Sequence, residues 1–114
     1  MDVHNIDGPG MDPTTWHPPV GFKYQMPYRM LVPKVIDNLL VAGRCVSCTN
    51  VALGSLRVMV PCMTMGQAAG MAAAMSIESD ISPRTVPVKE LQVNLRKDGA
   101  IVFEEDIIPA GEFE

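Results

Sequence analysis

The sequence predicts a helix-rich α+β fold in which short strands accompany two helices, a long buried one and an amphipathic one. Residues 61–77 form an uncharged, almost wholly apolar stretch, and a helix that is apolar on every side must be buried. Residues 87–98 carry apolar side chains at helical spacing on one face only. Residues 39–42 are a short apolar run bounded by turn formers, as in strands that are buried on both faces.

Both helices have recognisable ends. Pro61 and Pro87 are well placed at helix starts, where a backbone N–H would have no intrahelical partner. Arg96 and Lys97 would occupy the last turn of the second helix, with Gly99 just beyond it. Basic residues followed by glycine are typical of a helix C-terminus.

Two shorter elements are expected before the long helix. Residues 24–32 are apolar and aromatic but contain Pro27, which limits them to short edge strands. Residues 47–56 predict a short helix, with either Ser47 or Thr49 as its N-cap.

The chain divides into three parts by composition. Residues 1–23 are rich in Pro and Gly, which precludes a long helix and indicates an irregular lead-in. Residues 24–100 hold the predicted elements. Residues 101–114 are a short apolar stretch followed by an acidic tail with little to order it.

Charge and cysteine content narrow the function classes. The net charge is −4 and the nine Lys and Arg residues form no basic stripe, which argues against nucleic acid as a partner. Three cysteines, Cys45, Cys48 and Cys62, form no disulfide framework, and the N-terminus has no signal-peptide pattern, so a cytoplasmic location is expected. Cys45 and Cys48 have the spacing of a redox pair, but the thioredoxin-like unit around such a pair is absent. No His cluster or second Cys pair indicates a metal site.

The uncharged stretch between Arg57 and Glu78 has the length of a membrane span, and Gly66 and Gly70 form a G-x-x-x-G pair. Polar residues interrupt it, and it has no flanking aromatic belt, so we expect a buried helix rather than a membrane span. The polar residues and proline concerned are Pro61, Thr64, Gln67 and Ser76.

The start of this helix could bind an anionic group. Unpaired amides and the positive end of the helix dipole would stabilise an anion or an electron-rich carbonyl there. The residues concerned are Val60, Pro61, Cys62 and Met63. The negative edge of a reduced flavin is one such group. Tight helix packing is the alternative explanation for the small residues that follow.

A family resemblance favours the flavin. Several segments, in order and over most of residues 2–100, resemble the C-terminal part of a large FAD-dependent oxidoreductase family. These segments are Tyr24-Gln25-Met26-Pro27-Tyr28-Arg29, Leu31-Val32-Pro33-Lys34, Asp37-Asn38-Leu39-Leu40-Val41-Ala42-Gly43-Arg44, Val58-Met59, Pro61-Cys62-Met63 and Met65-Gly66-Gln67-Ala68-Ala69-Gly70. The resemblance implies that the predicted elements derive from the C-terminal part of an α/β FAD-binding fold.

The resemblance also implies where the cofactor would lie. Gly43 and Arg44 would lie beside the ribityl and phosphate portion of FAD. The helix start at Pro61, Cys62 and Met63 would face the pyrimidine edge of the flavin. Arg57 and Arg29 are the candidates for holding an anionic substrate or supporting the flavin, and salt bridging within the domain is their alternative role.

This chain departs from the family pattern in three respects. Arg44 stands where many flavoproteins have an acidic residue, so a carboxylate contact to the ribityl hydroxyls cannot be carried over. Thr49-Asn50-Val51 stands where relatives tend to have a His-Glu pair after the Thr. The Gly-rich turn that seats the pyrophosphate is missing, since Gly8-Pro9-Gly10 has no strand before it and no helix after it.

We therefore expect part of an FAD-dependent oxidoreductase that transfers hydride through flavin in its intact relatives, holds no FAD alone and is inactive as an isolated chain. The alternative is a non-enzymatic, self-associating interaction module. The expected partners are a second copy of the chain or the missing nucleotide-binding half, with no nucleic acid and no membrane. Substrate and electron acceptor cannot be deduced from the sequence.

Overall fold

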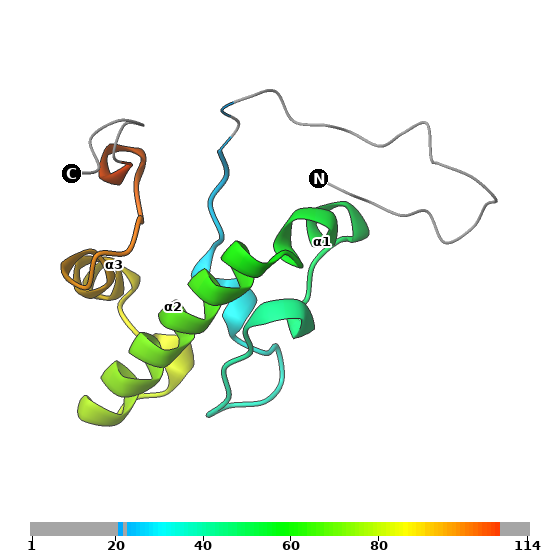
Figure 1. Ribbon diagram of the computed structural model, residues 1–114. Coiled ribbons are helices and arrows are strands. Elements are labelled where there is room, and N and C mark those ends of the chain that lie inside the picture. Colours follow the sequence, from blue (N-terminus) through cyan, green and yellow to red (C-terminus); the bar gives the residue numbers. More distant parts are fainter. Residues whose placement is uncertain (1–20, 22, 108–114) are drawn as a thin grey trace.

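Three α-helices and four short 3-10 turns make up the computed structural model, which describes residues 21 and 23–107 (Figure 1). Most of the predicted lead-in over residues 1–23, with Gly8-Pro9-Gly10, and the last part of the acidic tail lie outside the described residues. The elements in chain order are η1 (Tyr28–Leu31), η2 (Gly43–Cys45), α1 (Asn50–Leu56), α2 (Met59–Glu78), η3 (Pro83–Thr85), α3 (Val88–Lys97) and η4 (Glu104–Asp106).

The central element is α2, the longest helix of the described residues, as the sequence predicts. It begins at Met59, two residues before the predicted start. Pro61 is therefore its third residue, where a proline is still tolerated because the first four N–H groups of a helix have no intrahelical partner. The first intrahelical bond runs from the Cys62 N–H to the Val58 carbonyl at 3.2 Å.

The predicted burial of this helix on every side is wrong. Four of its residues are buried, Met65, Ala72, Met75 and Ser76. Met59, Met63 and Ile77 are 77%, 73% and 81% exposed. The described elements pack against one side of α2 and leave the opposite side to solvent.

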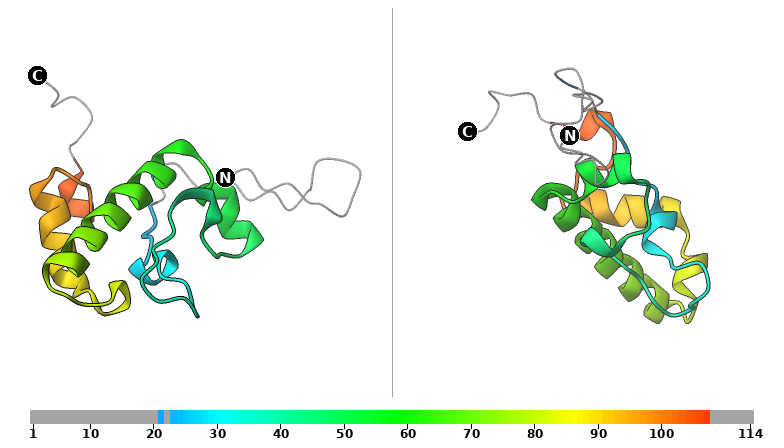
Figure 2. Two further views of the ribbon diagram at one scale, coloured as in Figure 1. Left: turned by 90° about the horizontal axis from the view of Figure 1, so that it is seen from below. Right: turned by 90° about the vertical axis from the view of Figure 1, so that its right-hand side faces the viewer.

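Two hydrophobic clusters form the core along that packed side. The C-terminal half of α2 contributes Ala72 and Met75 to a cluster with Val86, Leu91 and Leu95. Nearer its N-terminus, Met65 joins Leu31, Val46 and Leu56. Accordingly, α3 lies beside the C-terminal half of α2, whereas α1 and η2 lie at the other end (Figure 1 and Figure 2).

No strand is present among residues 21 and 23–107, so the predicted strands at 24–32 and 39–42 are wrong. Part of the first segment is η1. The second is extended, but its backbone link to η1 is the single hydrogen bond from the Val41 N–H to the Leu31 carbonyl at 2.8 Å. Leu40, Val41 and Ala42 pack against the core cluster around Met65, which explains why the run is apolar without a sheet.

The other predicted helices are present. Thr49, one of the two predicted caps, accepts a hydrogen bond from the Ala52 N–H at 3.3 Å and so caps α1. The second predicted helix is α3, which lies within one residue of the predicted bounds. Gly99 has a φ of +79°, the left-handed conformation expected just after a helix C-terminus.

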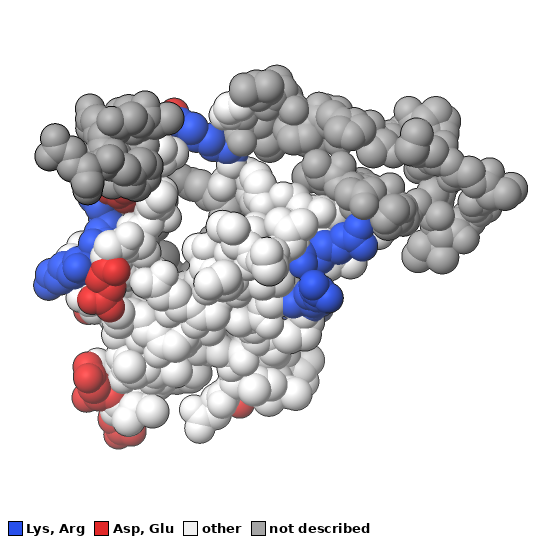
Figure 3. Space-filling view, viewed as in Figure 1, with Lys and Arg blue, Asp and Glu red and all other residues white. Residues whose placement is uncertain are grey.

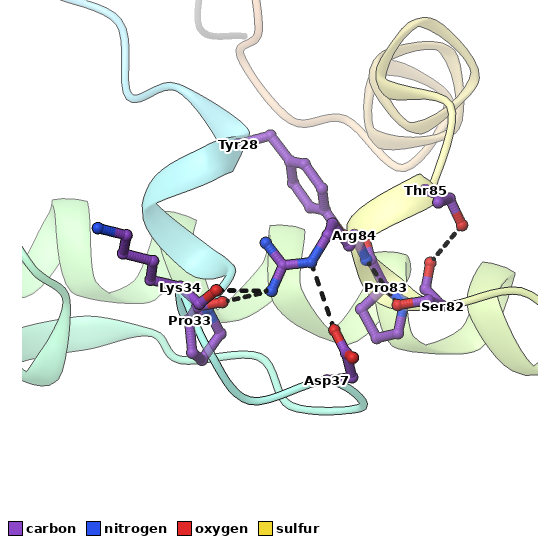
Figure 4. A network of polar contacts seen from close by, with 8 residues as sticks. All are labelled: Tyr28, Pro33, Lys34, Asp37, Ser82, Pro83, Arg84 and Thr85. Carbon is purple, nitrogen blue, oxygen red and sulfur yellow. Dashed lines mark hydrogen bonds and ion pairs between the residues drawn. The ribbon is translucent and has the colours of Figure 1, made fainter.

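A polar network ties the loop after η1 to η3. The Arg84 guanidinium reaches from η3 to the Pro33 carbonyl (2.7 Å), the Lys34 carbonyl (3.3 Å) and the Asp37 carboxylate (3.4 Å), as Figure 4 shows. Close by, the Tyr28 hydroxyl donates to the Pro83 carbonyl at 2.6 Å. Burial raises the pKa of the Tyr28 hydroxyl, which favours this protonated donor form.

The start of the predicted acidic tail is more ordered than expected. In η4, the Asp106 carboxylate accepts from the backbone N–H groups of Val102 (3.1 Å) and Phe103 (2.9 Å). It also pairs with Arg96 of α3 at 2.6 Å. The Arg96 guanidinium lies 5.3 Å from the centre of the Phe103 ring, so one arginine holds this segment in two ways.

No single helix in the described residues is long and apolar enough to cross a membrane. The helices α1 and α2 together reach the necessary length and hydropathy, but they are bent by 89° relative to each other.

Candidate functional site

The predicted flavin-contacting residues gather where η2 meets the first turn of α2. A Cβ built on Gly43 would lie 4.0 Å from the Cys62 Sγ, so the two predicted segments touch. Cys62 is half-buried, and its Sγ lies 3.4 Å from the Leu56 carbonyl at the end of α1. Three elements thus fix the start of α2 beside the glycine loop.

The glycine at position 43 is required by its backbone. Its φ is +78°, a left-handed conformation that costs most residues about 1–2 kcal/mol. Here the chain turns from the extended segment before it into η2, and a side chain would point toward Cys62. Sequence inspection identified this glycine through the family resemblance, and the structure gives the physical reason for it.

Arg44 and Arg57 are also brought together. The Arg44 Nε donates to the Arg57 carbonyl at 3.2 Å, which joins η2 to the residue that ends α1. Between residues 39 and 77 these two arginines are the only charged residues. In Figure 3 one group of basic side chains lies near the α1 end of the molecule, and the other basic side chains in view lie close to acidic ones.

The N-terminal turn of α2 presents backbone donors at this site. Val58 supplies no side-chain cap, and the first turn contains no acidic residue. The N–H groups of Met59 and Val60 precede the first intrahelical hydrogen bond, so they are two of the donors that a helix start leaves over. The sequence analysis named the Val60 amide but missed that of Met59. Its expectation of an unpaired amide at Cys62 is wrong, because the helix starts two residues earlier and the Cys62 N–H donates to the Val58 carbonyl. Met63 is largely exposed on the next turn.

Arg29 lies elsewhere, so the structure does not join the two predicted arginine candidates. It is exposed on η1 and lines a groove of about 850 Å³ between η1, α2 and α3. Polar groups in this groove include Gln25, Thr64, Gln67 and Gln92. Sequence inspection missed the groove because its walls come from segments that are remote from one another in the chain.

The remaining thiols and carboxylates add no metal site. Cys45 is exposed and donates to the Ala42 carbonyl, whereas Cys48 is half-buried against the cluster around Met65. No group of three or more His, Cys, Asp or Glu side chains that could hold a metal ion occurs in the described part of the chain.

A comparison with protein families identifies the family of this chain. The model of the FAD dependent oxidoreductase family matches residues 1–95. The chain belongs to this family. No curated protein and no solved structure matches it.

Intact members of the family use FAD, so the site can be compared with the needs of that cofactor. The donors at the start of α2, the glycine loop beside them and the two linked arginines suit the electron-rich, anionic edge of a flavin ring. The adenosine and pyrophosphate half has other needs, namely a strand, a Gly-rich turn and a helix. Residues 21 and 23–107 contain no such unit.

Proposed function

We propose that this chain supplies the wall that faces the flavin ring in an FAD-dependent oxidoreductase. The observation that carries the proposal is the position of Gly43 beside Cys62, where an added Cβ would lie 4.0 Å from the Sγ, so that the glycine loop faces the first turn of α2. Family membership supports the identity of the cofactor. We assign the cofactor contacts to Gly43, Arg44, Pro61, Cys62 and Met63.

When bound, FAD would accept or donate the hydride of the reaction. The residues of this chain orient the ring and set the charge around it. The Met59 and Val60 amides, together with the positive end of the α2 dipole, favour the anionic reduced ring over the neutral oxidised one. Arg44 and Arg57 act in the same direction, so bound flavin should have a higher reduction potential than free flavin.

Arg57 and Arg29 would differ in role. Arg57 lies at the ring site and is the better candidate for an anionic substrate group that reacts with the flavin. Arg29 lies in the separate groove and would act, if at all, on a remote part of a larger substrate. We assign no general acid or base beside either arginine.

The isolated chain should neither retain stoichiometric FAD nor turn over substrate. Without a seat for the pyrophosphate, the affinity that most FAD enzymes gain from the dinucleotide half is lost. The ring contacts alone should support weak binding of a simple flavin such as riboflavin.

Riboflavin titration of two glycine variants tests the proposal. Gly43→Val and Gly99→Val place the same β-branched side chain at nearly the same φ, +78° and +79°, so their backbone strain is matched. Only the first brings bulk against Cys62, since nothing lies within 4 Å of a Cβ at Gly99. We expect Gly43→Val to weaken riboflavin binding by about tenfold or more, equivalent to about 1.4 kcal/mol.

The Gly99→Val variant should bind riboflavin as the parent chain does. Fluorescence quenching of the flavin gives the affinities, and far-UV circular dichroism shows whether both variants remain helical. Equal losses in the two variants would place the flavin elsewhere, as would no loss in either.

A further inference from the structure

An uncharged stripe runs along the solvent side of α2. Its members are spaced three or four residues apart, so they share one face of the helix. We call it the outer stripe, and it consists of Met59, Met63, Gly66, Gly70, Ala74 and Ile77. All six are exposed, and the large side chains at the two ends are more than 70% exposed.

This surface is long and apolar. The 20 residues of α2 span about 30 Å. In Figure 3 the face of the molecule along α2 is free of charged side chains between the two ends of the helix. Val58 and Val60, which are 51% and 72% exposed, widen the apolar surface at its N-terminal end. Contiguous exposed apolar surface of this kind marks an interaction site.

The two ends of the outer stripe carry opposite charge. Arg57 directly precedes α2, and Arg44 is hydrogen-bonded to its carbonyl. Glu78 ends the helix, and Asp80 follows; both are exposed. Figure 3 shows the basic group near one end of α2 and the acidic group at the other. The helix dipole has the same polarity, positive at the N-terminus and negative at the C-terminus.

Two copies of a helix with this distribution of charge are complementary when they lie antiparallel. We propose that the outer stripe binds the outer stripe of a second copy of this chain, with the two α2 helices antiparallel. A two-fold axis near residue 68 would set Met59 of one copy against Ile77 of the other, and Gly66 against Gly70. Arg57 of each copy would then lie beside Glu78 and Asp80 of its partner.

The sizes of the side chains suit this register. Glycines near the axis allow the two backbones to approach closely, and the bulky side chains lie toward both ends, where the crossing helices diverge. The contact is isologous, which is the commonest way in which identical chains associate. The stripe shares Met63 and Arg57 with the proposed flavin site, whereas Gly70, at its centre, is not part of that site.

The occupant could otherwise be a different protein or a lipid surface. A lipid surface would be matched poorly by the acidic group at one end of the stripe. A second copy is favoured because an antiparallel arrangement brings opposite charges together at both ends of the stripe. The test below separates these occupants.

Light scattering on the purified full chain at micromolar concentration measures the association. Gly70→Glu is the disrupting variant: no atom lies within 4 Å of a Cβ at Gly70, and glutamate favours helix over glycine, so the fold should be kept. Val93→Glu is the control, with the same new charge at a 53% exposed position on α3. We expect dimers for the parent and Val93→Glu, and for Gly70→Glu an affinity at least tenfold weaker.

Disulfide trapping measures the orientation. In a Cys45→Ser background, which removes the exposed native thiol, Met59→Cys and Ile77→Cys chains are oxidised separately and as a mixture. The antiparallel register predicts a covalent dimer in the mixture, where position 59 meets position 77, and little in either chain alone. Efficient self-linking of Met59→Cys would indicate parallel helices and overturn the proposal. A monomeric parent chain would also overturn it, whether or not that chain binds vesicles or another protein, as would a Gly70→Glu dimer of unchanged affinity.

Discussion

Arg84 shows how one side chain can fix a loop that has no regular structure of its own. Its guanidinium contacts the backbone carbonyls of Pro33 and Lys34 and the carboxylate of Asp37. Carbonyl groups in an irregular loop need partners, and the planar fork of an arginine can serve two of them together. The loop leads into the segment that carries Gly43, so Arg84 helps to place the candidate flavin site.

Substitutions at Arg84 should separate the contribution of its planar guanidinium from the contribution of its charge. Arg84→Ala removes both and should lower the free energy of unfolding by about 1 kcal/mol. Arg84→Lys keeps the charge but loses the fork, and it should be nearly as destabilised because the ion pair with the 77% exposed Asp37 is worth little. Urea unfolding measures both. Asp37→Asn is the control, and a larger loss there than in Arg84→Lys would show that the ion pair dominates.

Asp106 gives the segment after α3 a dependence on pH. Hydrogen bonds from the Phe103 and Val102 amides, with Arg96 nearby, lower the pKa of this carboxyl, although its desolvation acts in the opposite direction. The folded pKa therefore lies below the value of about 3.9 for an unfolded aspartate. The stabilisation is complete above that value and is lost as the pH falls through the folded pKa.

An NMR titration of the Phe103 amide tests this account. Its chemical shift should change with a midpoint below that of an ordinary aspartate, as Asp106 takes up a proton and releases the amide. The Asp106→Asn variant should abolish that transition. A midpoint at or above the ordinary value would show that the hydrogen bonds to Asp106 do not persist in solution.

Among the elements, α1 depends most on its cap because it has only seven residues. Thr49→Ala should cost about 1 kcal/mol of stability, since it leaves the Ala52 N–H without its acceptor. Ser47→Ala, at the other position that the sequence offered as a cap, should change stability by only a few tenths of a kcal/mol. Thermal unfolding of the two variants compares them, and equal losses would contradict the assigned cap.

The helices could be predicted from local sequence, and the strands could not. Pro61, Gly99 and the apolar face of α3 are helix signals that depend only on residues close together in the sequence, so they hold in the folded chain. Proline is compatible with any of the first positions of a helix, so Pro61 could not fix the start of α2 to the residue. The run at 39–42 is apolar because it packs against the core around Met65, and an apolar run alone does not distinguish this from a sheet.

The candidate site could be predicted in part. The resemblance to the family gave Gly43, Cys62 and their neighbours, and the structure places those two residues side by side. The link between Arg44 and Arg57 and the separation of Arg29 from the site could not be foreseen. The first depends on how α1 turns between η2 and α2, and the second on where η1 packs along α2. The sequence carries no local signal for either arrangement.

At the scale of the whole molecule, we assign to α2 a part in both of the functions that the sequence offered as alternatives. One side of the helix packs on the core and starts beside η2, where we place the flavin ring. The outer stripe faces away from the core, and there we place a second copy of the chain. An all-apolar stretch therefore does not by itself show that a helix is buried on every side, since Met63 and Ile77 are exposed.

The central claim is that this chain contacts the flavin ring but gives no seat to the nucleotide half of FAD. The most direct test compares the affinities of the purified chain for riboflavin and for FAD under the same conditions. The account predicts measurable, weak binding of both, with FAD bound no more tightly than riboflavin. An FAD affinity about tenfold or more above that of riboflavin would reveal a nucleotide seat and contradict the claim, as would the absence of binding by either flavin.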